Sequence, residues 1–203
     1  NIDNVADIAI AAKFRNNGQV CISPNRFYVQ ENVKNEFVNA FIDRAKKLKI
    51  GNGMDEGVNL GPLTTAKRLE EIEKLVDKTK KEGAEVLLGG KRPSGFNKGF
   101  FYEPTVFDHV KDDFTIMKEE PFGPLVPMLS FKSFDEVIER ANDNDLGLCS
   151  YLYTNSMDKA NRGSELLETG CVAVNTGAVA IAEAPFGGIK QTGYGREGGS
   201  MAI

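Results

Sequence analysis

The chain has 203 residues, of which 41% are hydrophobic and 27% charged, a composition typical of a globular protein with a buried core. From this length we expect one compact α/β domain. The net charge of −4 and the dispersed basic residues argue against nucleic acid as a partner. The apolar runs are too short to cross a membrane.

Further classes of protein and kinds of site are excluded by the cysteines, the histidine and the ends of the chain. Three cysteines without paired spacing make no disulfide framework, so we expect a reducing, cytoplasmic location. With His109 as the single histidine, we predict neither a metal site nor a Ser-His-Asp triad. The chain begins at Asn1 without a methionine and stops after a glycine-rich stretch, so we expect a piece of a longer protein.

Hydrophobic periodicity predicts the elements of the first half of the chain. Val5, Ile8 and Ala12 fall on one face of a helix over 2–14, which Gly18 ends before Cys21. The elements predicted next are a strand over 26–30, a helix over about 32–48, an amphipathic helix that includes 69–79 and ends at Gly83, and a strand over 85–88.

The second half continues the alternation of strands and helices. After a polar loop over 91–99, the internal proline of a strand over 101–107 indicates an edge position in its sheet. Ser133 and Glu136 form a capping box for a helix to about Asn142. The remaining predicted elements are strands over 125–131, 148–154 and 171–175 and a helix over 157–168. This alternation predicts an α/β fold of three layers, with helices on both faces of a mostly parallel sheet.

Cys21 is the first candidate for chemistry, because it lies on a tight connection between a predicted helix and a predicted strand. Nearby backbone amides and access to solvent both help a thiolate to form and to attack a carbonyl carbon. The alternative interpretation is a small buried hydrophobic residue. We prefer that alternative for Cys149 and Cys171, which lie within apolar strand runs.

Two further segments are rich in glycine and proline. In residues 119–124, two prolines and a glycine form a rigid turn that can present an acid to a ribose diol and a ring to a nicotinamide; the alternative is a solvated surface turn. Gly193 to Gly198 matches the dinucleotide fingerprint G-x-G-x-x-G. Because no strand leads into it and no acidic ribose ligand follows, we interpret it as a close-packed loop.

Taken together, these segments resemble the aldehyde dehydrogenase superfamily over essentially the whole chain. The family's active-site pattern, an aromatic followed by Gly-Gln-x-Cys, is matched by Phe14 and residues 18–21. Its Glu-x-Phe-Gly-Pro pattern is matched by residues 120–124. Its Pro-Phe-Gly-Gly-x-Lys and Gly-x-Gly-Arg-Glu patterns are matched within residues 185–197.

The resemblance implies a mechanism and a set of residues that perform it. Cys21 attacks the aldehyde carbon, and its backbone amide helps to stabilise the oxyanion. The hemithioacetal passes hydride to NAD or NADP, and water hydrolyses the resulting thioester to the acid. Glu120 is implied to hold the nicotinamide ribose, and Phe122 to lie beside the nicotinamide. The small-molecule partner is an aldehyde, and the full-length protein is expected to be a homo-oligomer.

Within the superfamily the chain looks most similar to succinate-semialdehyde dehydrogenases. Arg15, six residues before Cys21, is suited to bind the carboxylate of a semialdehyde in a bidentate fashion; the alternative is a solvated arginine at a helix end. Phe186 is implied to contact the substrate. The chain departs from that subfamily at Ala180, where a serine is usual, and at Ser23, which is a second cysteine in some members.

The resemblance also implies what these residues lack. The general base, an asparagine of the oxyanion site, the nucleotide-binding domain that carries most of the cofactor contacts and a C-terminal oligomerisation strand lie outside residues 1–203, so we predict that the chain alone is inactive. The alternatives are an aldehyde dehydrogenase for another small aldehyde, a cysteine-dependent thioester hydrolase or acyltransferase, and a non-catalytic assembly module.

Overall fold

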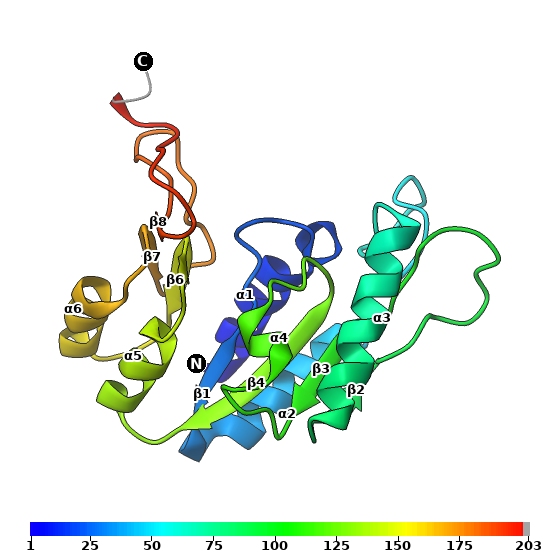
Figure 1. The fold of residues 1–203 in the computed structure, drawn as a ribbon, viewed down its shortest axis with the longest axis horizontal. Helices are drawn as coiled ribbons and strands as arrows, with labels where there is room; N and C mark the ends of the chain where they lie inside the picture. Colours follow the sequence, from blue (N-terminus) through cyan, green and yellow to red (C-terminus); the bar gives the residue numbers. More distant parts are fainter. Residues whose placement is uncertain (201–203) are drawn as a thin grey trace. The chain divides into compact units, whose positions relative to one another are not determined.

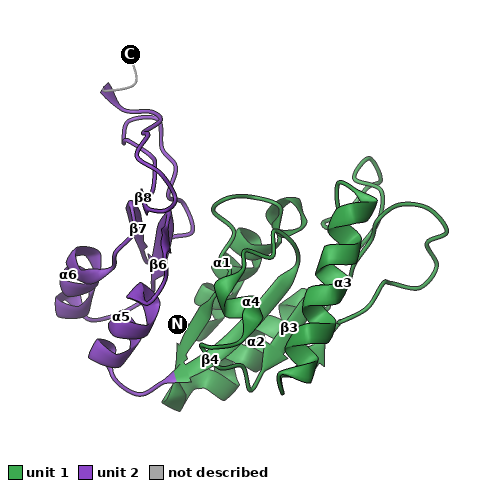
Figure 2. Ribbon diagram, viewed as in Figure 1, with its two compact units in different colours: residues 1–130 green, residues 131–203 purple. Residues whose placement is uncertain are grey.

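The computed structural model describes residues 1–200, and it divides the chain into two compact units (Figures 1 and 2). Unit 1 is Asn1–Ser130, and unit 2 begins at Phe131. The boundary coincides with the end of a strand, and no run of glycine or proline marks it. Each unit is described by itself.

Unit 1 contains helices and strands close to those predicted. In chain order they are α1 (Ile2–Phe14), the 3-10 helix η1 (Arg15–Gly18), β1 (Phe27–Gln30), the 3-10 helix η2 (Glu31–Val33), α2 (Lys34–Ala45), α3 (Ala66–Lys81), β2 (Glu85–Leu88), β3 (Thr105–Asp108), α4 (Thr115–Lys118) and β4 (Leu125–Phe131). Side chains cap two of the helices, since Asn1 accepts the amide of Asn4 and Thr65 accepts that of Arg68.

The four strands of unit 1 form one sheet in the order β1-β4-β3-β2. β3 and β4 run parallel, whereas β2 joins β3 antiparallel at the edge. Alternate residues of β4 point to opposite faces, so Leu125 and Leu129 pack in one core while Val126 and Met128 pack in the other.

The two cores lie on opposite faces of this sheet and give unit 1 three layers. The core under α3 and α4 includes Ile72 and Phe107, and the core under α1 and α2 includes Phe41 and Val106. Because helices cover both faces and parallel pairs form in both units, the predicted α/β class with a mostly parallel sheet is confirmed.

One predicted feature of this sheet is wrong. The proline in the segment 101–107 indicated an edge strand, but β3 lies between β4 and β2. β3 begins at Thr105, directly after Pro104, so the proline removes no hydrogen-bond donor from the ladder. Residues 101–104 form no strand, and the sequence pattern wrongly joined them to β3.

Unit 2 contains two small sheets and two helices. Its elements are α5 (Phe134–Asn142), β5 (Leu146–Gly147), β6 (Cys149–Leu152), α6 (Met157–Leu166), β7 (Cys171–Val174) and β8 (Ile189–Lys190). β6 and β7 pair parallel, and β5 and β8 pair antiparallel. The predicted capping box is present, because the Ser133 hydroxyl accepts the amide of Glu136 and the Glu136 carboxylate accepts that of Ser133.

The glycines of the C-terminal segment are not all packed as predicted. A Cβ added at Gly193 or Gly195 would meet no atom within 4 Å, so this part of the loop is open. The close packing lies upstream, where a Cβ on Gly187 would come within 2.3 Å of the Gly195 carbonyl oxygen. Residues of the motif therefore contact Gly187 and Gly188, since the Gly195 carbonyl lies against Gly187 and Arg196 donates to the Gly188 carbonyl.

None of the helices formed by residues 1–200 is long and apolar enough to span a membrane.

Candidate active site

The Cys21 loop begins where α1 ends, and its backbone is unusual. Asn16, Asn17 and Gly18 all have positive φ angles, of 48°, 59° and 75°. Asparagine and glycine are the residues that adopt this left-handed conformation at the lowest cost. The run Asn-Asn-Gly therefore turns the chain sharply after Phe14, where an amphipathic pattern alone would have continued the helix.

Buried amide side chains fasten this loop to the segment 61–64. The Asn17 amide nitrogen donates to the Gly61 carbonyl at 3.0 Å, and the Gln19 side-chain oxygen accepts the Thr64 amide at 2.9 Å. Gln19 is 6% exposed and Asn17 is 1% exposed. Because their bonds are shielded from water, they hold the loop in one conformation.

Cys21 lies on a tight turn with its thiol accessible. The Ser23 amide donates to the Val20 carbonyl at 2.9 Å and closes the turn around Cys21. The Ser23 hydroxyl is buried and donates to the Lys13 carbonyl at 3.0 Å, which ties the turn back to α1. Cys21 itself is an exposed free cysteine. An exposed thiol on a fixed turn is the arrangement that nucleophilic attack requires.

Glu120 and Phe122 lie on the rigid turn between α4 and β4. Pro121 and Gly123 are buried, Phe122 is half-buried with φ of 45°, and Glu120 is exposed. Arg68 on α3 donates to the Pro121 carbonyl at 3.4 Å. Glu120 has no hydrogen-bond partner among residues 1–200, so both of its carboxylate oxygens are available to hydroxyl donors.

The structure brings the Cys21 loop and the Glu120 turn into contact. A Cβ built on Gly18 would stand 2.2 Å from the carbonyl oxygen of Gly123, so glycine alone permits this approach. Figure 1 shows the loop after α1 beside the loop between α4 and β4, at one end of the unit 1 sheet. Segments separated by about a hundred residues in the sequence therefore form one site.

Arg15 is placed at the start of the Cys21 loop. It follows the last residue of α1 with an extended ψ of 128°, and its side chain is exposed. No hydrogen bond or ion pair joins it to another residue in the part of the chain that the structure describes. A guanidinium group without a protein partner is available to bind a carboxylate from solution.

Phe186 belongs to unit 2 and is half-buried. Its amide and carbonyl pair with those of Glu197, at 2.7 Å each, which joins the two ends of the loop that carries the C-terminal motifs. The structure describes this loop within unit 2 alone, so a role for Phe186 beside Cys21 stays a prediction.

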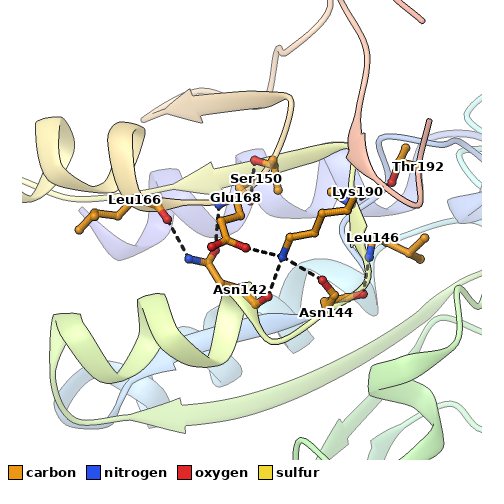
Figure 3. Close-up of polar contacts among 10 residues, drawn as sticks. Asn142, Asn144, Leu146, Ser150, Leu166, Glu168, Lys190 and Thr192 are labelled. Carbon is orange, nitrogen blue, oxygen red and sulfur yellow. Dashed lines mark hydrogen bonds and ion pairs between the residues drawn. The ribbon is translucent and has the colours of Figure 1, made fainter. Parts of the chain in front are cut away.

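Lys190 anchors the same loop to the rest of unit 2. Its ammonium group donates to the carbonyls of Asn142 and Asn144, at 2.8 and 2.9 Å, and forms an ion pair with Glu168 at 2.6 Å (Figure 3). Its φ of 55° is a left-handed value that this network holds in place. The lysine of the Pro-Phe-Gly-Gly-x-Lys pattern is thus bound by residues of unit 2 and stabilises the loop that carries it.

Sequence reasoning missed Lys13, in the last turn of α1. Its side chain is 0% exposed, and burial lowers the pKa of its ammonium group to about 7, although the negative charge of Glu120 acts to raise it. Ala6, Ala9 and Lys13 follow one another at the spacing of a single helical face, and the first two are buried. A lysine on an apolar stripe was the signal available in the sequence.

Comparison with known proteins finds similar sequences that match all or nearly all of the chain. The model of the aldehyde dehydrogenase family matches residues 1–203. A mitochondrial succinate-semialdehyde dehydrogenase of Oryza sativa is 44% identical over all of this chain and 38% of its own length. A probable NADP(+) succinate-semialdehyde dehydrogenase of Sinorhizobium fredii is 44% identical over 98% of this chain and 40% of its own length. A glutarate-semialdehyde dehydrogenase of Pseudomonas putida is 42% identical over all of this chain and 42% of its own length.

Solved structures share the fold. A succinate-semialdehyde dehydrogenase from Burkholderia pseudomallei superposes with a TM-score of 0.96 at 41% identity, covering all of this chain and 42% of that one. An aldehyde dehydrogenase of Bacillus cereus, solved as an NAD+ complex, gives 0.95 at 39% identity, covering all of this chain and 41% of that one. The chain thus spans about two fifths of the length of the proteins it matches.

Proposed function

The chain belongs to the aldehyde dehydrogenase family, and on that premise we propose that residues 1–203 are the thiol-bearing catalytic domain of an enzyme that oxidises succinic semialdehyde with NAD or NADP. The observation that supports this proposal is the contact between the Cys21 loop and the Glu120 turn, since Cys21 is an exposed free cysteine and Gly18 of its loop abuts Gly123 of the turn. In this proposal the nucleotide-binding domain corresponds to a part of the relatives that this chain does not span.

Cys21 performs the covalent chemistry in this proposal. Its sulfur attacks the aldehyde carbon, a carbon–sulfur bond forms, and the carbonyl π electrons move to the oxygen. The Cys21 amide donates to that oxyanion in this proposal. After the substrate carbon has lost its hydride, the intermediate is a thioester on Cys21. Water then adds to the thioester carbon, the carbon–sulfur bond breaks, and the acid leaves with the thiolate regenerated.

The Glu120 turn fits a nicotinamide cofactor. When bound, the nicotinamide accepts the hydride from the substrate carbon. Glu120 offers both carboxylate oxygens to a ribose diol, and Phe122, held with positive φ between buried residues, offers an aromatic ring. Relatives named for NADP(+) and solved with NAD+ support both cofactors as candidates.

Arg15 supports a substrate that carries a carboxylate. Two of the similar proteins are named for succinate and glutarate semialdehydes, each of which ends in a carboxylate opposite the aldehyde. The exposed Arg15 guanidinium at the start of the Cys21 loop supplies two parallel donors for such a group. We therefore prefer succinic semialdehyde to a neutral small aldehyde.

The position of His109 weighs against the hydrolase alternative. His109 follows the C-terminal end of β3 and contacts Glu85 at 3.4 Å. The Glu120 turn precedes the N-terminal end of β4, and β3 and β4 are parallel. His109 and the Cys21 loop therefore lie at opposite ends of the parallel strands, and the chain's single histidine is not a base for Cys21.

The test is a Cys21→Ser variant of the full-length protein. Aldehyde-dependent NADH or NADPH formation should fall at least about a thousandfold, as removal of a covalent nucleophile does, while cofactor Kd stays unchanged. Cys149→Ser, in a strand of unit 2, is the matched control and should retain activity. Activity that survives Cys21→Ser would refute the proposal, and thioester hydrolysis without nucleotide would favour the hydrolase.

A further inference from the structure

Lys13 is an ionisable side chain that the fold buries completely. It is 0% exposed, and its ammonium nitrogen has no hydrogen-bond partner among residues 1–200. Removing an ammonium group from water costs several kcal/mol unless an opposite charge or hydrogen bonds compensate. A methionine or leucine at this point of α1 would avoid that cost, so the lysine calls for a role beyond packing.

The charged group that acts on Lys13 is the carboxylate of Glu120. Glu120 is exposed, whereas Lys13 is fully buried. Two contacts fix the elements that carry the pair, since the Ser23 hydroxyl bonds the Lys13 carbonyl and the Gly18 backbone abuts Gly123. The same contacts that build the candidate active site therefore join the element that carries Lys13 to the turn that carries Glu120.

We propose that Lys13 is a positioning residue for the nicotinamide cofactor, whose ammonium group is the counter-charge that orients the Glu120 carboxylate when a ribose diol covers it. The inference rests on the proposed function in one respect, the role of Glu120 as the ribose ligand. Lys13 touches neither cofactor nor substrate in this proposal, and it acts through Glu120 alone.

Electrostatics gives the proposal a measurable consequence. A bound cofactor removes water from Glu120 and lowers the local dielectric, which strengthens its attraction to protonated Lys13. By linkage, cofactor binding then raises the pKa of Lys13, and protonation of Lys13 tightens cofactor binding. Because the pKa of Lys13 in the free chain is about 7, binding slightly above that pH should take up protons and should weaken as the pH rises further.

The experiment measures cofactor Kd for the full-length protein by titration calorimetry at pH 6.5 and pH 8.5. At pH 6.5, Lys13→Met should weaken binding about tenfold, the order expected when one member of a charge pair is removed. At pH 8.5 the difference from wild type should shrink, because wild-type Lys13 is then largely neutral. Lys67→Met, which removes a lysine whose side chain is 85% exposed, should leave Kd unchanged at both pH values.

A double-mutant cycle with Glu120→Gln separates the positioning role from a merely structural one. If Lys13 acts through Glu120, Lys13→Met should weaken binding no further in the Glu120→Gln background. An equal loss in both backgrounds would overturn the proposal, as would a Kd for Lys13→Met within twofold of wild type. If Glu120→Gln itself keeps the wild-type Kd, the ribose role of Glu120 fails, and this inference with it.

Wild-type protein supplies a readout that needs no variant to fold. The apparent binding enthalpy measured near pH 7.5 in two buffers of different ionisation enthalpy gives the number of protons taken up. Fractional uptake is expected, and its absence would overturn the proposal. If the same preparation oxidises succinic semialdehyde normally, such a failure concerns Lys13 and leaves the proposed function intact.

Discussion

At the scale of single residues, the candidate site contains two kinds of polar residue. Some are exposed, and others are buried and hydrogen-bonded to residues far away in the sequence. Cys21, Arg15 and Glu120 are exposed, whereas Gln19 and Asn17 are buried and bonded to the segment 61–64. The motifs predicted the first three. The local pattern gave no sign of the second pair, because their partners, the Gly61 carbonyl and the Thr64 amide, lie more than forty residues away.

Arg15 should determine preference for carboxylated aldehydes. Arg15→Gln removes the bidentate contact, and a charged hydrogen bond of this kind contributes about 1.5–3 kcal/mol, so kcat/KM for succinic semialdehyde should fall about 10- to 100-fold. Oxidation of a neutral aldehyde such as butanal should change less than threefold. Arg92→Gln, which removes an exposed arginine paired with Glu73, is the control. An equal loss on both aldehydes would mean that Arg15 does not read the carboxylate.

Lys13 should make stability depend on pH with a definite sign. Its folded pKa of about 7 lies below the ordinary lysine value of 10.5, so between these values the unfolded chain binds more protons and stability rises with pH. The destabilisation by Lys13 is therefore complete below about pH 7 and fades toward pH 10.5. Lys13→Met should raise the urea midpoint strongly at pH 6 and much less at pH 9.5. A gain that is equal at both pH values would contradict this account.

At the scale of elements, local signals predicted most of the helices and strands. The limits of α1, β2 and β4 agree with their patterns, and the Ser133 capping box starts α5 as expected. The four-residue α4 and the two-residue strands β5 and β8 are too short for periodicity to show them. The central position of β3 depends on its neighbours in space, and no pattern within the strand records them.

The junction of the Cys21 loop with the Glu120 turn should tolerate no side chain at Gly18. Gly18→Ala would put a Cβ 2.2 Å from the Gly123 carbonyl oxygen at a φ of 75°, so we expect a loss of about 2 kcal/mol or more in unfolding free energy and a lower kcat. Urea unfolding and steady-state kinetics measure both. Gly53→Ala, where a Cβ would meet no atom within 4 Å, should change neither by much. Wild-type stability in Gly18→Ala would show that the two loops separate freely.

At the scale of the whole molecule, the resemblance to a family carried the prediction further than composition did. The family patterns, spread over residues 14–197, predicted the site and the fold class, and solved relatives confirm the fold with TM-scores of 0.95 and above. Composition gave no sign of the division into two units, because the boundary between Ser130 and Phe131 falls at the end of β4 and no linker marks it. The cytoplasmic location stays a prediction, since several relatives are named as mitochondrial.

The share of the relatives that the chain spans leads to a prediction about residues 1–203 alone. They carry Cys21, the proposed nucleophile, and Glu120, whereas the resemblance assigns the general base and most cofactor contacts to segments outside them. Hydride transfer and thioester hydrolysis need those groups. The isolated chain should therefore form no measurable NADH or NADPH from succinic semialdehyde, while the full-length protein does. Circular dichroism checks that the isolated chain is folded, and alkylation followed by mass spectrometry checks that Cys21 reacts before Cys149 and Cys171. Turnover by that preparation would place the missing groups within the chain itself.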